Sequence, residues 1–549
     1  MDWVFAWTWR LRMKLNREGL KDIEFWLENE IKTPTYDIEN TIKNTKETPR
    51  WIHFGGGNIF RGFIARLQDE LLEKGLDDIG IIAAETFDFD IIDKIYKPYD
   101  NLVLSVGLRG NGETKKQVLA SICDSVKASI REESDFERLK KAFQAPSLQM
   151  ASFTITEKGY ALKDSKGNYF NTVLEDLENG PTKANHAMCI TTALLLERFN
   201  AGRYPVAIVS MDNCSHNGEK LKASVLDVAD KWLEKGFVNQ AFIDYISDES
   251  KVSFPWSMID KITPRPAKEI EENLISLGLE EISPVITNKG TFIAPFVNAE
   301  IPEYLVIEDN FPNGRPKLEE AGVYFSDRDT VNKSETMKVT TCLNPLHTAL
   351  AVYGCLLGYD SIAKEMNDNE LKKLVEKIGY DEGIKVVVDP KIINPRNFID
   401  EVINERLPNP FIPDSPARIA TDTSQKVAIR FGETIKAYIK SPSLDVNALQ
   451  FIPLAIAGWF RYLLGVDDGL KPFKISDDPM LSDLQEGLKE IKIGNKDSYK
   501  GQLKPFLANK VIFGLDLVEA GLSEKIELMF LELIEGSGAV RKTLVKYLD

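Results

Sequence analysis

The pattern of apolar positions predicts a strand, a glycine turn and a helix near the start of the chain. Residues 51–54 (WIHF) form a short, largely apolar segment that stops at three consecutive glycines, which is typical of a strand ending in a tight turn. Residues 58–74 place apolar side chains at helical spacing, and Gly75 follows where a helix would end. A strand, a glycine turn and a helix in this order open a dinucleotide-binding unit.

Further apolar segments predict strands that alternate with helices. The strands are expected at 79–84, 102–106, 152–156 and 206–210, with an amphipathic helix near 133–144. This alternation predicts a mainly parallel sheet covered on both faces. From about Leu346 helical patterns dominate instead, at 348–357, 369–378, 444–463 and 524–534.

The predicted fold class is α/β, with an N-terminal Rossmann-like doubly wound sheet and a second, mostly α-helical C-terminal domain. Proline and glycine cluster between about 295 and 340, which favours a domain boundary there. We therefore expect an N-terminal extension and lead-in at 1–48, a dinucleotide-binding domain at 49–300 and a mainly helical substrate-binding domain at 301–549.

Composition and net charge limit the kinds of molecule that the protein is expected to bind. The 549 residues are 43% hydrophobic and 9% aromatic, which supplies the apolar area that disordered chains lack. Lys and Arg number 68 and Asp and Glu 84, so the net charge is −16. That sign disfavours nucleic acid and anionic membranes as general partners and leaves room for a local basic pocket. We expect a small-molecule substrate and a monomer or small homo-oligomer.

Cysteine usage and the terminal residues predict a cytoplasmic protein. The five cysteines lie far apart without a CxxC motif, and no apolar run reaches the roughly 20 residues that span a bilayer. Residues 1–12 (MDWVFAWTWRLR) place their basic residues after the apolar stretch, which is the wrong order for a signal peptide. We expect these residues to be a dispensable extension.

The glycine turn is the first candidate site. Gly55 and Gly57 would let the backbone approach a pyrophosphate, and the helix that starts near Asn58 and Ile59 would offer it free N–H groups. The segment GGGNIFRGF departs from the GxGxxG pattern, and an ordinary tight turn is the alternative. Glu85, at the end of the second predicted strand, would accept hydrogen bonds from the adenosine ribose and so favour NAD over NADP. The alternative is a solvated acid at a strand end.

A second candidate site lies in the segment MKVTTCLNPLH. Lys338 could donate or accept a proton, while Asn344 and His347, three residues apart, could hold a carbonyl oxygen. The alternative is that Asn344 caps a helix and that His347 is an ordinary, partly buried histidine. The four histidines show no metal-ligand spacing, so no metal is expected.

Several motifs together resemble one family. The polyol-specific long-chain dehydrogenases, or mannitol dehydrogenase family, carry similar segments in the same order, and the resemblance runs from about residue 14 to the C-terminus. The segments are HFGGGNIFRGF (53–63), SFTITEKGY (152–160), SMDNCSHNG (210–218), FPWSMIDKITP (254–264), YLVIEDNFPNGRP (304–316), KVTTCLNPLH (338–347) and RIATDTSQKVAIRF (418–431).

The resemblance implies a role for each matching residue. Lys338 would be the general acid in carbonyl reduction, and Asn344 and His347 would bind the reacting oxygen. Asn213 would contact the substrate beside the nicotinamide, with its neighbour Asp212 on the cofactor side. Asp260 would lie at the cleft of cofactor and substrate; the alternative is a helix or turn cap. Arg418 and Lys426 would hold the far end of the substrate; the alternative is a pair of surface charges.

The resemblance has one departure in residue spacing, and one of its segments bears on the choice of substrate. In relatives the lysine usually stands five residues before the asparagine, whereas Lys338 stands six before Asn344. We therefore expect a helix start, a π-bulge or a non-helical stretch between them. The glycine segment is more similar to those of uronate reductases and mannitol-1-phosphate dehydrogenase than to that of mannitol 2-dehydrogenase, which favours a uronate substrate.

The resemblance thus implies an NAD-dependent, metal-independent oxidoreductase that interconverts a keto sugar acid and its hydroxy acid, with D-fructuronate and D-mannonate as the favoured pair. Mannitol 2-dehydrogenase, acting on fructose and mannitol, and tagaturonate reductase are alternatives in the same class. A non-catalytic sensor of NAD or of a sugar acid, suggested by the displaced lysine, is an alternative in another class.

Overall fold

The computed structural model describes residues 12–549; the predicted extension at 1–12 lies almost wholly outside the described residues. The chain forms two compact units. Unit 1 runs to Leu108 and continues over Gly112–Asn332, and unit 2 contains Arg109–Asn111 and Lys333–Asp549. The division at residue 332 falls later than the predicted boundary at 300, because strands formed by residues 304–326 pair with an earlier strand of unit 1.

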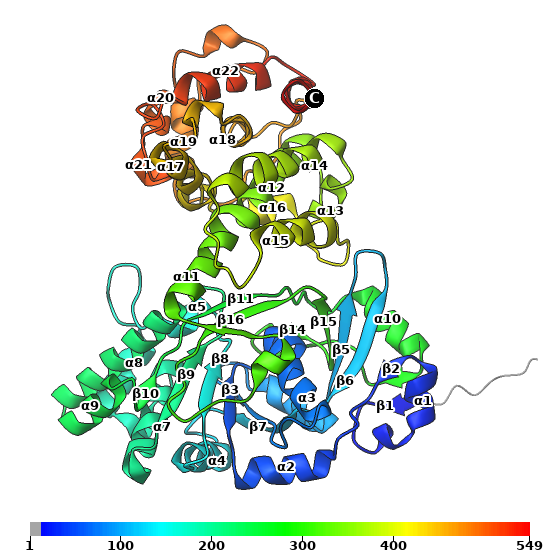
Figure 1. Cartoon of the computed structure of the whole chain (residues 1–549), viewed down its shortest axis with the longest axis vertical. Coiled ribbons are helices and arrows are strands. Elements are labelled where there is room, and N and C mark those ends of the chain that lie inside the picture. Colours follow the sequence, from blue (N-terminus) through cyan, green and yellow to red (C-terminus); the bar gives the residue numbers. More distant parts are fainter. Residues whose placement is uncertain (1–11) are drawn as a thin grey trace, which may run out of the picture. The chain divides into compact units, whose positions relative to one another are not determined.

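The central sheet of unit 1 has six strands that all pair in parallel (Figure 1). Their order is β10 (Val252–Ser253), β9 (Val206–Ser210), β8 (Met150–Phe153), β3 (Trp51–Phe54), β4 (Ile81–Glu85) and β7 (Ile122–Lys127). The chain builds outward from β3 first toward β7 and then, starting with β8, toward β10. The reversal lies between β3 and β8, where doubly wound sheets bind their ligands.

Both faces of this sheet are buried, and the side chains of each strand alternate between them. Ile52 and Phe54 of β3 pack in one apolar cluster, which includes residues of six helices, and Trp51 packs in a second cluster on the opposite face. This is why the strands are apolar at nearly every position. Four of the six helices in the first cluster are α4 (Glu133–Gln144), α7 (Ala187–Gly202), α8 (Asn217–Glu234) and α9 (Gln240–Ser247); α3 (Ala65–Glu73) contributes to the second.

The strand predicted at 102–106 exists but belongs to another sheet. It is β5 (Val103–Leu108), which pairs antiparallel with β6 (Thr114–Leu119) and parallel with β15 (Phe296–Glu300). The spacing of apolar residues could not show which sheet this strand joins, because strands of both sheets contain consecutive buried apolar residues. The other strands are β2 (Ile31–Lys32), also in this sheet, β11 (Ser257–Asp260) with β16 (Tyr304–Glu308) and β17 (Tyr324–Ser326), β1 (Met13–Lys14) with β12 (Leu279–Glu280), and β13 (Val285–Ile286) with β14 (Phe292–Ile293).

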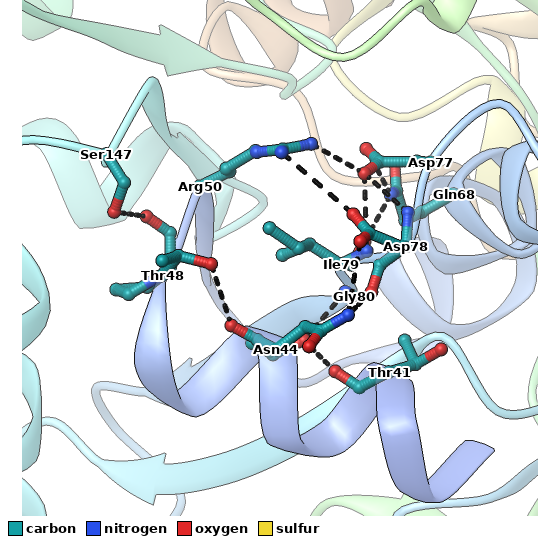
Figure 2. A network of polar contacts seen from close by, with 12 residues as sticks. Thr41, Asn44, Thr48, Arg50, Gln68, Asp77, Asp78, Ile79, Gly80 and Ser147 are labelled. Carbon is teal, nitrogen blue, oxygen red and sulfur yellow. Dashed lines mark hydrogen bonds and ion pairs between the residues drawn. The ribbon is translucent and has the colours of Figure 1, made fainter. Parts of the chain in front are cut away.

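The described part of the predicted lead-in is a folded part of unit 1. It contains α1 (Ile23–Glu28) and α2 (Ile38–Glu47). Figure 2 shows how polar contacts fasten its end to the turn before β4. Asn44 Nδ2 donates to Asp78 Oδ2 at 3.1 Å, and Arg50 Nη1 lies 2.8 Å from Asp77 Oδ1. Gln68 of α3 donates to Asp77 Oδ2 at 3.0 Å, so the lead-in and the first helix of the sheet share one network.

Unit 2 is helical, as predicted. Its buried centre includes α12 (Asn344–Leu357) and α18 (Phe451–Tyr462), which are joined by a hydrogen bond from the Tyr353 hydroxyl to the Leu454 carbonyl at 2.8 Å. The helix predicted over 444–463 starts only at Phe451, because the Glu382 carboxylate accepts from the N–H groups of Gln450, Phe451 and Ile452 and so caps the helix there.

The remaining helices complete both units. Unit 1 also contains α5 (Thr156–Tyr160), α6 (Asn171–Asn179) and α10 (Lys268–Ser276), and α11 (Arg328–Met337) runs across the division. Unit 2 also contains α13 (Ile362–Glu365), α14 (Asn369–Glu376), α15 (Pro395–Glu401), α16 (Pro416–Ile419), α17 (Glu433–Lys440), α19 (Leu481–Leu488), α20 (Lys504–Leu507), α21 (Lys510–Phe513), α22 (Ser523–Leu533) and α23 (Ala539–Leu548). Within residues 12–549, none of the helices has the length and apolar character needed to cross a membrane.

A buried histidine links the stability of unit 1 to pH. The ring of His53 on β3 stacks on Phe60 with centroids 4.1 Å apart, and its two nitrogens lie 2.7 and 2.8 Å from the hydroxyl oxygens of Ser152 and Thr154. Burial lowers the pKa of His53 from 6.5 to about 3. The unfolded chain therefore binds more protons than the folded chain between these values, and stability falls as the pH drops below 6.5.

We predict that His53→Gln reduces this acid sensitivity. Protonation of this side chain in the unfolded state should cost about 2 kcal/mol of stability between pH 7 and pH 5, and the variant should not incur that cost, although lost packing lowers its stability at pH 7. Urea unfolding at both pH values measures the difference, with His216→Gln at a half-exposed side chain as the control. Equal acid sensitivity in wild type and His53→Gln would contradict the prediction.

Candidate active site

The glycine loop of unit 1 follows β3 at the reversal of strand order. Gly55 has a φ of +102°, and a side chain there would overlap the carbonyl oxygen of Thr154 beyond β8. Gly55 is therefore required by the fold itself. The next helix begins at Asn58, and the Arg61 N–H donates to the Gly57 carbonyl at 3.1 Å, which is the first hydrogen bond of that helix. A π-helical segment at Phe60–Ile64 then leads into α3.

At Gly57, in contrast, neither the backbone conformation nor a contact with another described residue requires glycine. Its φ lies outside the left-handed region, and a Cβ built on it meets no atom within 4 Å. The residue therefore borders open space at a helix N-terminus, where unpaired N–H groups and the helix dipole favour an anion. Beside it, Asn58 Oδ1 is buried and has no hydrogen-bond partner within the described part of the chain, while its amide donates weakly to Pro264 O at 3.4 Å. These features fit the pyrophosphate of a dinucleotide, and the adjacent Ile59 is half buried.

Glu85 is the last residue of β4, as predicted, but it is buried and not solvated. Its Oε2 accepts from the Gly56 N–H at 2.7 Å, and its Oε1 accepts from the N–H groups of Thr86, Phe87 and Asp88 at 2.9–3.2 Å. Burial raises the pKa of Glu85, and these four donors oppose that shift. The structure thus places Glu85 against the glycine loop; hydrogen bonding to a ribose stays a prediction.

Asp212 and Asn213 lie just beyond the end of β9, after Met211. Asp212 is buried, and its carboxylate accepts from the Ile155 and Thr156 N–H groups and from the Tyr160 hydroxyl, at 2.8, 3.1 and 2.6 Å. It thereby holds the turn after β8, where Thr156 has the strained φ of +64°. Burial raises the pKa of Asp212, and the Tyr160 hydroxyl opposes this. Asn213 is exposed at the end of this strand.

Asn217 was not predicted as a site residue, yet it organises this edge. Its amide donates to Asp212 O and Ser257 O, both at 3.0 Å, and its Oδ1 accepts from Ser257 N at 3.0 Å. It therefore joins the end of β9 to the start of β11. The buried Asp260 is the last residue of β11, paired with Tyr304 of β16. Asn217 lies within the SMDNCSHNG segment, which is the only sequence signal for it.

The predicted irregularity between Lys338 and Asn344 is a π-helical segment. It spans Lys338–Cys342, and the Leu343 N–H donates to the Lys338 carbonyl at 3.1 Å, a five-residue step. Such a step accommodates one extra residue in a helix, which explains the six-residue spacing. Lys338 is buried, with 2% of its surface exposed. Both α11, which precedes the segment, and α12, which follows it, are ordinary α-helices.

Asn344 is the first residue of α12 and does not cap it. Leu343 occupies the cap position, and no side chain bonds to the free N–H groups there. The alternative role of Asn344 as N-cap is therefore wrong. Asn344 and His347 are three residues apart in this helix, so they share a face.

His347 is a neutral imidazole near a group of cations. Burial lowers its pKa to about 4; Asp414 opposes this, and Arg430, Arg418 and Arg406 add to it. Its Nε2 is buried without a hydrogen-bond partner among the described residues, and Asp414 Oδ2 lies 3.7 Å away. A neutral ring with one uncommitted nitrogen can bind a substrate oxygen.

The cations around His347 form a cluster that we call the cationic cluster: Arg406, Arg418, Lys426 and Arg430. Arg418 pairs with Asp414, and Lys426 donates to the Thr421 carbonyl. Burial lowers the pKa of Lys426, and Arg430 and Arg418 lower it further. Arg430 donates to the Thr348 hydroxyl at 2.5 Å, and burial lowers its pKa to about 10. Arg430, four residues after Lys426, and the distant Arg406 were not predicted.

Residues 12–549 contain no group of three or more His, Cys, Asp and Glu side chains placed to hold a metal ion. Independence from metal stays a prediction.

Comparison with known families identifies the architecture. Residues 49–320 match the mannitol dehydrogenase Rossmann domain, and residues 330–533 match the mannitol dehydrogenase C-terminal domain. The chain belongs to the mannitol dehydrogenase family. The predicted family and fold class are confirmed, and this member of the family is an oxidoreductase.

Relatives of this mannitol dehydrogenase family member cover nearly its whole length. A D-mannonate oxidoreductase of Thermotoga maritima is 55% identical over 97% of this chain and 98% of its own. A mannitol 2-dehydrogenase of Emericella nidulans is 29% identical over 98% and 99%. Among solved structures, Pseudomonas fluorescens mannitol 2-dehydrogenase in ternary complex with NAD and D-mannitol has a TM-score of 0.69 at 26% identity and covers 98% of this chain and 99% of its own.

We predict that Gly57→Ala separates cofactor binding from folding. The added methyl group enters open space, so the free energy of unfolding should change by less than about 1 kcal/mol. The same group would occupy the position of the pyrophosphate and should weaken NADH binding at least about tenfold. Fluorescence titration with NADH and thermal unfolding measure the two effects. Gly55→Ala, which clashes internally, should lose stability, and unchanged NADH affinity in Gly57→Ala would contradict the prediction.

Proposed function

We propose that this protein is an NAD-dependent, metal-independent oxidoreductase that interconverts D-fructuronate and D-mannonate. The observation that carries this proposal is the cationic cluster beside His347. The chain has a net charge of −16, yet Arg406, Arg418 and Arg430 act on His347, and Lys426 lies beside two of them. Arg418 pairs with Asp414, whereas neither Lys426 nor Arg430 forms an ion pair with a carboxylate among residues 12–549. A sugar-acid carboxylate supplies the missing negative charge, whereas a neutral polyol does not.

The relatives support the same substrate class. The D-mannonate oxidoreductase is 55% identical over nearly the full chain, while the mannitol 2-dehydrogenase of Emericella nidulans reaches 29%. The NAD complex of the Pseudomonas fluorescens enzyme supports the cofactor. The π-helical segment accommodates the extra residue between Lys338 and Asn344. The six-residue spacing is therefore no reason to favour a non-catalytic sensor. Within the described residues Cys123, Cys189, Cys342 and Cys355 form no disulfide, which is consistent with a cytoplasmic protein.

The residues of each unit have distinct roles in the proposed reaction. In unit 1, the glycine loop and the helix after it bind the pyrophosphate of NADH, which supplies the hydride. In unit 2, the Asn344 amide and the neutral His347 bind the keto oxygen, and the cationic cluster binds the carboxylate. Lys338 gives a proton to that oxygen as negative charge develops on it. In the oxidative direction Lys338 accepts the proton.

A substrate panel with NADH tests the proposal. Fructuronate should be turned over with a far higher kcat/KM than fructose, and tagaturonate is the uronate control. Lys426→Met should raise the KM for fructuronate at least about tenfold, because a charge-assisted hydrogen bond contributes roughly 1.5–3 kcal/mol. Its effect on fructose should be small. Higher kcat/KM for fructose than for fructuronate in the wild type would overturn the substrate assignment.

We predict that Lys338→Ala lowers kcat by at least about 10²-fold, because general acid catalysis contributes that much. NADH affinity should stay within about twofold, since the glycine loop belongs to the other unit of the chain. Steady-state kinetics and an NADH titration measure both quantities, and Lys333→Ala, five residues earlier on α11, is a nearby control. Near-native turnover by Lys338→Ala would assign the proton transfer to another group.

A further inference from the structure

The peptide groups around Gly56 are held from both sides by two side chains, one from the last residue of β4 and one from the π-helical segment that comes after it. The Gly56 N–H donates to Glu85 Oε2 at 2.7 Å, and the Tyr96 hydroxyl donates to the Gly56 carbonyl at 2.9 Å. A Cβ on Gly56 would lie 3.2 Å from the Tyr96 ring and 3.3 Å from Glu85 Oε2. The middle glycine is therefore packed and hydrogen-bonded between two buried side chains, directly before the open space at Gly57.

The Glu85 carboxylate is almost fully used by the backbone. A carboxylate offers about four acceptor positions, and Glu85 accepts four N–H groups, one on Oε2 and three on Oε1. Burial leaves 6% of the residue exposed. A ribose diol would have to compete for oxygens that already bind the loop. Both carboxylate oxygens accept N–H groups of the backbone. If glutamine replaced Glu85, its NH₂ group would face a backbone N–H in either orientation of the side-chain amide.

Tyr96 is fixed in the same way. It ends the π-helical segment Ile92–Tyr96, is 1% exposed, and burial raises the pKa of its hydroxyl, which therefore stays a donor. The Arg61 guanidinium lies 6.0 Å from the centre of its ring and donates to the Ala294 carbonyl at 2.7 Å. Arg61 belongs to the helix that follows the loop, so the ring connects the loop to that helix.

We propose that Glu85 and Tyr96 are positioning residues that set the orientation of the glycine loop for the dinucleotide, and that Glu85 acts mainly through the Gly56 N–H and not on the ribose. This inference rests on the proposed use of NAD. The N–H groups that follow Gly56 can bind a pyrophosphate only if the two peptide groups around Gly56 keep their orientation. Loss of either contact should weaken every nicotinamide dinucleotide alike, before any substrate binds.

The first test removes one hydroxyl. Tyr96→Phe keeps the ring and its packing but loses the bond to Gly56, so the Kd for NADH and the Kd for NADPH should both rise about tenfold, while kcat at saturating NADH stays within about twofold. Tyr353→Phe is the matched control, because it removes an equally buried hydroxyl that donates to a carbonyl at 2.8 Å in unit 2. The control should lose similar stability and leave the NADH Kd unchanged.

The second test replaces the carboxylate. Glu85→Gln should weaken NADH binding more than about tenfold, because an amide donor then faces a backbone N–H. Glu382→Gln is the control, since Glu382 is a buried carboxylate that accepts three backbone N–H groups in unit 2. The inference is overturned if Tyr96→Phe binds NADH as wild type does, or if Glu85→Gln keeps its NADH affinity and gains affinity for NADPH, which is the signature of a ribose contact.

Both titrations are made on the full-length protein without substrate, so they do not depend on which sugar acid is turned over. A wild type that binds NADH but does not reduce fructuronate would contradict the proposed substrate and leave the positioning roles supported if the variants behave as expected. A wild type that binds no NADH would overturn both.

Discussion

The close approach between the end of β3 and the end of β8 is the constraint on which the dinucleotide site depends. Parallel strands buried on both faces must leave the sheet by a tight turn, and here the turn passes so near Thr154 that only glycine fits at position 55. The conformation of Gly55 sets the course of the chain after it. It therefore affects the peptide groups of Gly56, the open position at Gly57 and the start of the helix at Asn58.

Around this turn, buried polar side chains form hydrogen bonds with backbone groups. Glu85, Asp212 and Asn217 each follow or join the end of a central strand, and each satisfies several N–H or carbonyl groups of the loops beyond it. A buried carboxylate without such donors would be costly. The carboxyl-terminal edge of the sheet is thus made rigid by hydrogen bonds from side chains that apolar packing could not replace.

Unit 2 uses a different device. A single π-helical segment between two α-helices shifts Lys338 relative to Asn344 and His347 without breaking the chain's helical path. Burial lowers the pKa of His347 and of Lys426, and the neighbouring arginines lower both further. The histidine therefore stays neutral, while the cluster as a whole favours an anion. A neutral ring on α12 thus lies near cations from other elements, which is the arrangement that the proposed substrate needs.

The sequence by itself determined four of the six strands of the central sheet (β3, β4, β8 and β9), the helical character of unit 2 and the family, and it singled out the glycine loop, Lys338 and His347 as candidates; β7 and β10 were not predicted. These follow from local information, namely apolar periodicity, glycine placement and short motifs. Tertiary structure alone decided that β5 joins a second sheet, that residues 304–326 belong to unit 1, and that Asn344 does not cap its helix. It also decided that Glu85 binds the loop, and that Arg406 and Arg430 act on His347. The physical reason is that these features depend on which groups meet across long sequence separations, and a residue's partners in space are not encoded in its neighbours along the chain.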